Sequence, residues 1–138
     1  MRQQASNHSS WGAFVLRVVV GVVFAAHGAQ KLFSFGLDGV ASFMGEAGFP
    51  LPYVSAVAAT AAELLGGVAL VAGFYTRLAA IPLAFTMLVA MVKVHLGGGF
   101  FLPEGFEYTF TLFGASVALV LLGSGPVSID AWRGNRKS

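Results

Sequence analysis

The feature that most constrains this chain is a set of four apolar stretches that fill most of its 138 residues. They run approximately over residues 11–32, 53–74, 78–96 and 106–123. Each approaches the roughly 20 residues that a helix needs to cross about 30 Å of hydrocarbon. Only 10 % of the residues are charged, whereas a soluble domain carries about 25 %. The sequence therefore predicts an all-α membrane protein, a bundle of four transmembrane helices in one domain covering residues 1–138.

Composition excludes several classes of function. The net charge is +2, and the basic residues form no run beyond Arg133, Arg136 and Lys137, so we expect no nucleic-acid partner. Cysteine is absent, which excludes a thiol–disulfide relay and a thiolate metal site. No hydrolase triad spacing, phosphate-binding glycine loop or nucleotide fingerprint occurs. Redox chemistry in this chain would need a borrowed cofactor or a mobile carrier.

Charge asymmetry predicts the orientation of the bundle. Arg2, Arg77 and the basic C-terminal tail lie on one side of the predicted spans, and Asp38, Glu46 and Glu104 lie in the links on the other side. By the positive-inside rule, both termini face the cytoplasm, and the protein resides in the cytoplasmic membrane. We expect the first span to be retained and not cleaved as a signal peptide, because three further spans follow it.

The link between the first two spans predicts a short amphipathic helix on the outer membrane surface. Asp38 can cap its start. Four apolar residues follow at positions i, i+3, i+4 and i+7, namely Val40, Phe43, Met44 and Ala47. The second outer link, residues 97–103, is too apolar for a plain solvent loop, and we expect it to fold back over the bundle.

Ionisable residues within the spans are site candidates, because such groups face a partner or a wet cavity. Glu63 lies near the bilayer midplane, and Arg17 differs from it in depth by only roughly 6 Å at 1.5 Å per residue. One interpretation pairs the two side chains. In the alternative, Arg17 extends to the headgroups and Glu63 is a protonated, hydrogen-bonded acid. Together with Arg77, these residues are the predicted structural polar residues.

Polar residues converge at the outer end of the predicted bundle. His27, Gln30 and Lys31 share one face of the first span, on a stripe whose small residues favour packing against other helices. The third span contributes Lys93 and His95, and the fourth begins with Glu107 and Tyr108. The predicted catalytic residues are His27, His95 and Glu107, and the predicted ligand-binding residues are Gln30, Lys31 and Tyr108. An ordinary interfacial belt is the alternative, and we prefer it for Lys93.

Three chemistries fit such a cluster. Imidazole and carboxylate groups can bind the carbonyl oxygens of a quinone and exchange protons with it, which is the interpretation that we rank first. Two histidines and one carboxylate could instead bind a metal ion, the second choice. Axial ligation of a haem ranks third, because His95 lies near the end of its span.

Matching segments distributed over nearly the whole chain resemble the DoxX family of small four-helix membrane proteins. They are residues 27–33 (HGAQKLF), 63–67 (ELLGG), 73–77 (GFYTR), His95 with 99–101 (GFF), 107–108 (EY) and 125–130 (GPVSID). Relatives in this family are described as the membrane subunit of a thiosulfate:quinone oxidoreductase, and as membrane partners of sulfur-transfer and superoxide-detoxifying proteins. The candidates carried over on these matches are His27, Lys31, Glu63, Arg77, His95, Glu107 and Tyr108.

The working hypothesis is therefore a quinone-interacting membrane subunit of an oxidoreductase complex. An alternative from another class is a non-catalytic membrane scaffold that docks a soluble redox enzyme. A transporter is a third possibility, and four spans without an internal repeat give it little support. The expected partners are the lipid bilayer, a soluble redox protein and a second copy of the chain.

Overall fold

The computed structural model describes residues 2–136, and the regular structure in this range is entirely helical. The elements are α1 (Arg2–Ala29), the π-helix η1 (Gln30–Phe35), α2 (Gly36–Glu46), α3 (Pro52–Ala72), α4 (Thr76–Ala90), the π-helix η2 (Met91–His95), the 3₁₀ turn η3 (Leu96–Gly98), α5 (Glu107–Leu122) and α6 (Ile129–Asn135). The described residues contain no β-strand, which confirms the predicted all-α class.

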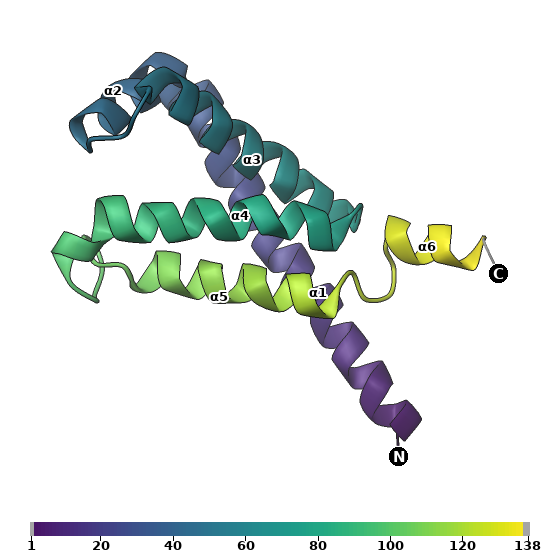
Figure 1. Cartoon of the computed structure of the whole chain (residues 1–138). Helices are drawn as coiled ribbons and strands as arrows, with labels where there is room; N and C mark the ends of the chain where they lie inside the picture. Colours follow the sequence, from purple (N-terminus) through teal and green to yellow (C-terminus); the bar gives the residue numbers. More distant parts are fainter. Residues whose placement is uncertain (1, 137–138) are drawn as a thin grey trace.

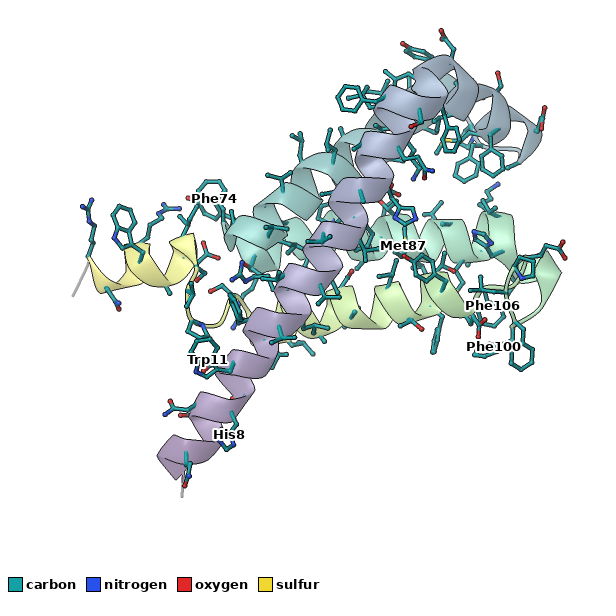
Figure 2. The ribbon with its side chains drawn as sticks, turned by 180° about the vertical axis from the view of Figure 1, so that it is seen from behind. His8, Trp11, Phe74, Met87, Phe100 and Phe106 are labelled. Atoms are coloured by element: carbon teal, nitrogen blue, oxygen red, sulfur yellow. The ribbon has the colours of Figure 1, made fainter. Side chains whose placement is uncertain are left out.

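Three helical segments are long and apolar enough to cross a membrane: Ser6–Glu46, Pro52–Ala72 and Thr76–Gly98. The fourth apolar helix, Glu107–Leu122, is shorter. Helix α1 crosses α3, and α4 lies beside α5 (Figure 1). Both termini lie at one end of the molecule, and α2 lies at the other (Figure 1). The side chains confirm this layout, since His8 and Trp11 lie at one end of the molecule and Phe100 and Phe106 at the other (Figure 2).

A continuous apolar core joins α1, α3, α4 and α5. Its buried members are Val20 and Phe24 of α1, Leu70 of α3, Ala80, Leu83 and Met87 of α4, and Leu112 and Leu119 of α5. Large apolar side chains also cover the outward faces, where Leu65, Phe85 and Leu121 are each about two-thirds exposed (68 %, 66 % and 71 %). Such faces suit a hydrocarbon environment, because lipid chains contact these apolar side chains in place of water.

Three glycines allow α1 and α3 to pack in backbone contact. A Cβ atom added to Gly28 would lie 2.7 Å from the Cα of Leu64, and one added to Gly67 would lie 2.8 Å from the Cα of Ala25. Gly21 meets the backbone of Val71 in the same way, at 2.8 Å. Small residues permit this approach in membranes, where dispersion contacts replace the hydrophobic effect between helices. The contacts fix the antiparallel register of α1 against α3.

Helix α2 occupies the segment where the sequence predicted a short helix. Val40 and Met44 are buried against Ala56 of α3. Asp38 does not cap the helix as predicted, because η1 leads directly into α2 and the N-cap position belongs to Phe35. Asp38 instead lies in the first turn of α2 and is exposed.

Candidate functional site

The centre of the candidate site is an ion pair between the first and second long helices. The Lys31 ammonium donates to both carboxylate oxygens of Glu63, each at 2.5 Å. Glu63 is 2 % exposed, and the Lys31 side chain is 25 % exposed. A buried carboxylate is tolerated when a cation and hydrogen bonds compensate for its desolvation. The pair therefore holds an anion inside the packed helices, with its cation reaching toward the surface.

The register of α1 and α3 explains this pairing. Gly28 lies opposite Leu64, so Glu63 lies opposite the last turn of α1, close to where η1 begins. Lys31 belongs to the six-residue π-helix η1. π-Helical turns occur frequently at functional sites, where they redirect side chains that a regular α-helix would place elsewhere.

His27 and Tyr108 add two protic groups beside the pair. Their ring centroids are 6.0 Å apart, with planes inclined at 38°. His27 in turn lies about one helical turn before Lys31 along α1 and η1. Both His27 and Tyr108 are exposed, so their protic groups are accessible from outside the packed helices. Helices α1, α3 and α5, with η1, thus converge in one cluster formed by His27, Lys31, Glu63 and Tyr108, which we call the outer cluster.

The imidazole of His27 has a defined orientation. Its Nδ1 lies 2.8 Å from the carbonyl oxygen of Val23. A carbonyl oxygen can only accept, so Nδ1 must carry the proton and donate it. In the neutral ring, Nε2 is then left as an acceptor that can take up a proton.

His95 and Glu107 have different partners from His27. The Nδ1 of His95 donates to the carbonyl oxygen of Glu104 at 3.3 Å, and an oxygen of Glu107 accepts from the amide of Leu102 at 2.8 Å. Both residues therefore fasten the link between η3 and α5. Within residues 2–136, no group of three His, Cys, Asp or Glu side chains could hold a metal ion.

The other outer polar residues also take separate places. Gln30 is exposed. The Lys93 ammonium donates to the carbonyl oxygen of Gly48 at 3.2 Å and lies over the ring of Phe49. Lys93 thus joins η2 to the link after α2, a role that the predicted interfacial belt did not include.

Arg17 is fully buried, and its guanidinium donates to main-chain carbonyl oxygens and lies 5.3 Å from the centre of the Phe14 ring. Its Nη1 donates to Leu70 at 2.6 Å and to Val71 at 2.7 Å, at the C-terminal end of α3. Its Nε donates to Ser124 at 2.9 Å, and its Nη2 donates to Val127 at 3.1 Å. The guanidinium therefore donates to carbonyl oxygens at the C-terminal end of α3, and it binds the segment between α5 and α6 to α3.

The predicted pairing of Arg17 with Glu63 is therefore wrong, and so is the alternative in which Arg17 extends to the headgroups. The depths inferred from the sequence place Trp11 level with the end of α3. The glycine contacts instead place Glu63 opposite Ala29, which is twelve residues, or about 18 Å along the axis, from Arg17. The sequence alone did not give the register of α1 against α3. Gly21, Gly28 and Gly67 are the residues in the sequence that indicate this register.

Arg77, the third predicted structural residue, lies at the opposite end from the outer cluster. It is exposed, and its guanidinium makes long contacts to the carbonyl oxygens of Val120 (3.3 Å) and Leu122 (3.5 Å). Sequence reasoning missed Asp130, whose carboxylate accepts from the amides of Tyr75 (2.8 Å) and Thr76 (2.9 Å) and so caps α4.

Comparison with known proteins identifies the family. Residues 12–96 match the DoxX family. The chain is 34 % identical over 119 residues to "Putative oxidoreductase CatD" of Bacillus subtilis, which covers 86 % of this chain and 84 % of that protein. It is 29 % identical over 122 residues to "Inner membrane protein YphA" of Escherichia coli, covering 84 % and 86 % of the two chains. An "Uncharacterized protein" of Haemophilus influenzae is also 29 % identical, over 119 residues that cover 83 % and 85 % of the two chains. No solved structure gives a significant match.

The apolar helices and the membrane location in the name of one relative agree with the composition, and the chain is an integral membrane protein. The resemblance drawn from the sequence segments is confirmed by a family match that covers more than half of the residues and by a relative of matching length. This protein belongs to the DoxX family.

Proposed function

We propose that this protein is a quinone-interacting membrane subunit of an oxidoreductase complex, and that the quinone headgroup binds at the outer cluster. The observation that carries the proposal is the position of exposed His27 and Tyr108 near the Lys31–Glu63 pair, whose carboxylate is buried. The name of the Bacillus subtilis relative supports an oxidoreductase role.

The outer cluster offers the groups that quinone chemistry needs. A quinone carbonyl oxygen accepts hydrogen bonds, and an ammonium and a phenol can donate them. Two-electron reduction of a quinone to a quinol consumes two protons. His27 offers Nε2 as an acceptor, and an imidazole in hydrogen-bond reach of a substrate can act as a general acid or base. The Lys31 cation would stabilise negative charge on the reduced headgroup, while Glu63 holds that cation in place.

Electrons would have to come from another protein. The sequence has no cysteine, and no motif for a bound nucleotide or flavin occurs in it. A soluble redox enzyme is therefore the proposed electron donor. His95 and Glu107 hold the link of residues 99–106 in place, and this link would form the rim of the site. Both side chains would also be available for proton transfer.

The proposal includes a placement in the membrane. Helix α5 has 16 residues and is about 24 Å long, so it would span the bilayer as a fourth helix with little tilt. Helix α2 would lie at the outer surface, and both termini would face the cytoplasm across the cytoplasmic membrane.

The test is quinone retention by the purified protein. The full chain is extracted in a mild detergent, and retained quinone is quantified by chromatography of a solvent extract and by absorbance on borohydride reduction. We expect quinone in the wild type, and an at least about tenfold weaker affinity in His27→Ala and in Tyr108→Phe, because each loses a polar contact to the headgroup.

His8→Ala is the matched control, because His8 is also an exposed histidine of α1 and lies at the far end of the molecule (Figure 2). It should retain quinone like the wild type. Wild-type protein that neither retains nor rebinds added quinone would contradict the proposal.

A second candidate function is a non-catalytic scaffold that docks a soluble redox enzyme. The observation that favours it is that His95, Glu107 and Lys93 bind main-chain atoms of the two outer links. Those polar residues therefore shape a surface. A scaffold would co-purify with its enzyme. The activity of that enzyme would be the same with the His27→Ala variant as with the wild type.

A further inference from the structure

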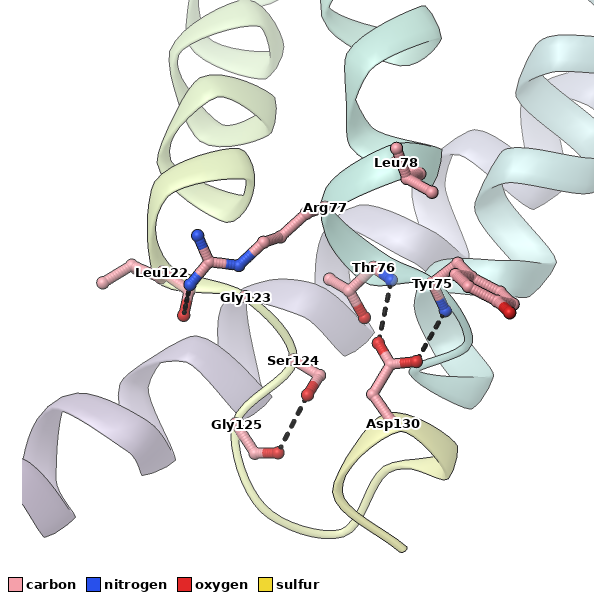
Figure 3. A pocket seen from close by; sticks show the side chains of 9 residues that line it. All are labelled: Tyr75, Thr76, Arg77, Leu78, Leu122, Gly123, Ser124, Gly125 and Asp130. Carbon is pink, nitrogen blue, oxygen red and sulfur yellow. Dashed lines mark hydrogen bonds between the residues drawn. The ribbon is translucent and has the colours of Figure 1, made fainter. Parts of the chain in front are cut away.

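A pocket lined by both polar and apolar residues lies at the end of the molecule opposite the outer cluster, outside the proposed quinone site. Its volume is about 440 Å³, and it is formed where α4 begins, α5 ends and α6 begins (Figure 3). Its lining residues are Tyr75, Thr76, Arg77, Leu78, Leu122, Gly123, Ser124, Gly125 and Asp130.

The pocket has a well-defined frame. The Asp130 carboxylate accepts from the amides of Tyr75 and Thr76, which fixes α6 against the start of α4. Gly123 has a positive φ of 84°, and a Cβ atom there would lie 3.1 Å from the Nε of Arg77. The glycine thus leaves room for the guanidinium beside the end of α5.

Two polar groups of the pocket have unused hydrogen-bonding capacity. The contacts of Arg77 to Val120 and Leu122, at 3.3 and 3.5 Å, are longer than ordinary N–H···O bonds, and its guanidinium has five donors. Thr76 is 1 % exposed, and its hydroxyl has no hydrogen-bond partner among the described residues. Figure 3 shows this hydroxyl directed toward Asp130. A buried hydroxyl without a partner is unfavourable, which indicates that a polar group can be accommodated beside Asp130.

We propose that this pocket binds the headgroup of a glycerophospholipid that carries a primary amine, with its phosphodiester on Arg77 and its ammonium beside Asp130. A guanidinium matches the geometry of phosphate oxygens with paired donors. Each Asp130 oxygen accepts one backbone amide, which leaves acceptor capacity for an ammonium. The opposite charges of Arg77 and Asp130 complement a zwitterion.

The surroundings favour a lipid over a soluble phosphate compound. Leu78 and Leu122 lie on the pocket wall and are 63 % and 50 % exposed, so they offer apolar contact to acyl chains beside the polar groups. Exposed Tyr75 and Trp132 at the same end are typical of a membrane interface. The arginines of α6 stack on these rings: Arg133 lies over Tyr75, and Arg136 lies over Trp132.

The test is native mass spectrometry of the full chain in detergent. The probes are phosphatidylethanolamine, phosphatidylcholine and phosphatidylglycerol with identical acyl chains, and soluble glycerophosphoethanolamine. We expect phosphatidylethanolamine to bind several-fold more tightly than phosphatidylcholine, whose trimethylated nitrogen has no N–H donor. Arg77→Gln should weaken phosphatidylethanolamine binding about tenfold, because it removes a charge-assisted contact.

Arg136→Gln is the matched control, because Arg136 is a nearby arginine, and neither Arg136 nor the Trp132 ring on which it stacks lines the pocket. It should change the affinity less than twofold, and a thermal melt should show both variants folded. The wild-type comparison of headgroups requires no variant. Equal binding of the ethanolamine and choline lipids, preference for phosphatidylglycerol, or equal losses in the two arginine variants would overturn the proposal. Binding of the soluble headgroup as tight as that of the lipid would overturn the lipid assignment.

Discussion

The Lys31 ammonium binds both carboxylate oxygens of Glu63, so the acid in the middle of the second long helix is neutralised by a cation from the end of the first. The two residues are linked through the backbone packing of α1 on α3, in which Gly28 contacts Leu64. The same ion pair therefore joins the two helices and places a cation near exposed His27 and Tyr108, where we propose that the quinone binds.

Lys31→Met should be strongly destabilising, because it leaves a carboxylate buried without its partner. Removal of one member of a buried pair costs about 3–5 kcal/mol. Adding Glu63→Gln should recover much of that loss, since the double variant buries no unpaired charge. Thermal melts of the four proteins of this cycle in detergent measure the coupling. Additive effects of the two substitutions would contradict the pairing.

Gly28→Ala should disrupt the packing of α1 on α3. The added Cβ would lie 2.7 Å from the Cα of Leu64, so the two backbones would have to separate. Gly114→Ala is the control, because a Cβ at Gly114 of α5 meets nothing within 4 Å. It should be neutral or stabilising by up to about 1 kcal/mol through helix propensity. Unfolding in sodium dodecyl sulfate distinguishes the two variants, and equal stability would refute the close approach.

Arg17→Lys should destabilise the protein although it conserves the charge. A single ammonium cannot reach carbonyl oxygens on both α3 and the segment after α5, as the guanidinium does. Each orphaned carbonyl costs about 1–3 kcal/mol. Arg77→Lys serves as the control, since Arg77 is exposed and its contacts are long. Limited proteolysis near Ser124 should increase in Arg17→Lys alone. The role of Arg17 would be refuted if both variants were cleaved at the same rate.

Glu107→Gln should preserve the fold of the link before α5, whereas Glu107→Ala should not. Glutamine keeps an oxygen that can accept from the Leu102 amide, and alanine has none. Hydrogen exchange of the Leu102 amide measures this difference. If Glu107 also transfers protons in the proposed quinone site, Glu107→Gln should lose activity while retaining amide protection. Loss of protection in Glu107→Gln would show that the carboxylate charge itself holds the link.

Reporter fusions should place the first outer link and the C-terminus on opposite sides of the membrane. The expectation follows from the basic residues near the termini and at Arg77. A fusion after Glu46 should report the outer side, and a fusion after Ser138 should report the cytoplasmic side. Both reporters on one side would exclude a four-span arrangement.

Local composition was sufficient to predict the long helices and their membrane environment. Apolar runs of membrane-spanning length favour a helix whatever packs against it, because main-chain groups need internal partners in hydrocarbon. The sequence also indicated that Glu63 needs a hydrogen-bonding partner inside the protein, whereas it left open whether Arg17 pairs with Glu63 or extends to the headgroups. The family segments indicated DoxX membership, which the comparisons confirm.

Tertiary structure alone decided which partners those residues have. Glu63 binds Lys31, and Arg17 binds carbonyl oxygens on two segments, because glycine contacts shift α1 along α3 relative to the depths inferred from the sequence. The cap of α4 by Asp130 could not be predicted from the sequence either, because Asp130 and the start of α4 are distant in the chain. Sequence determines that a buried charge must be neutralised, but the partner is set by helix register, which depends on backbone contacts between residues far apart in the chain.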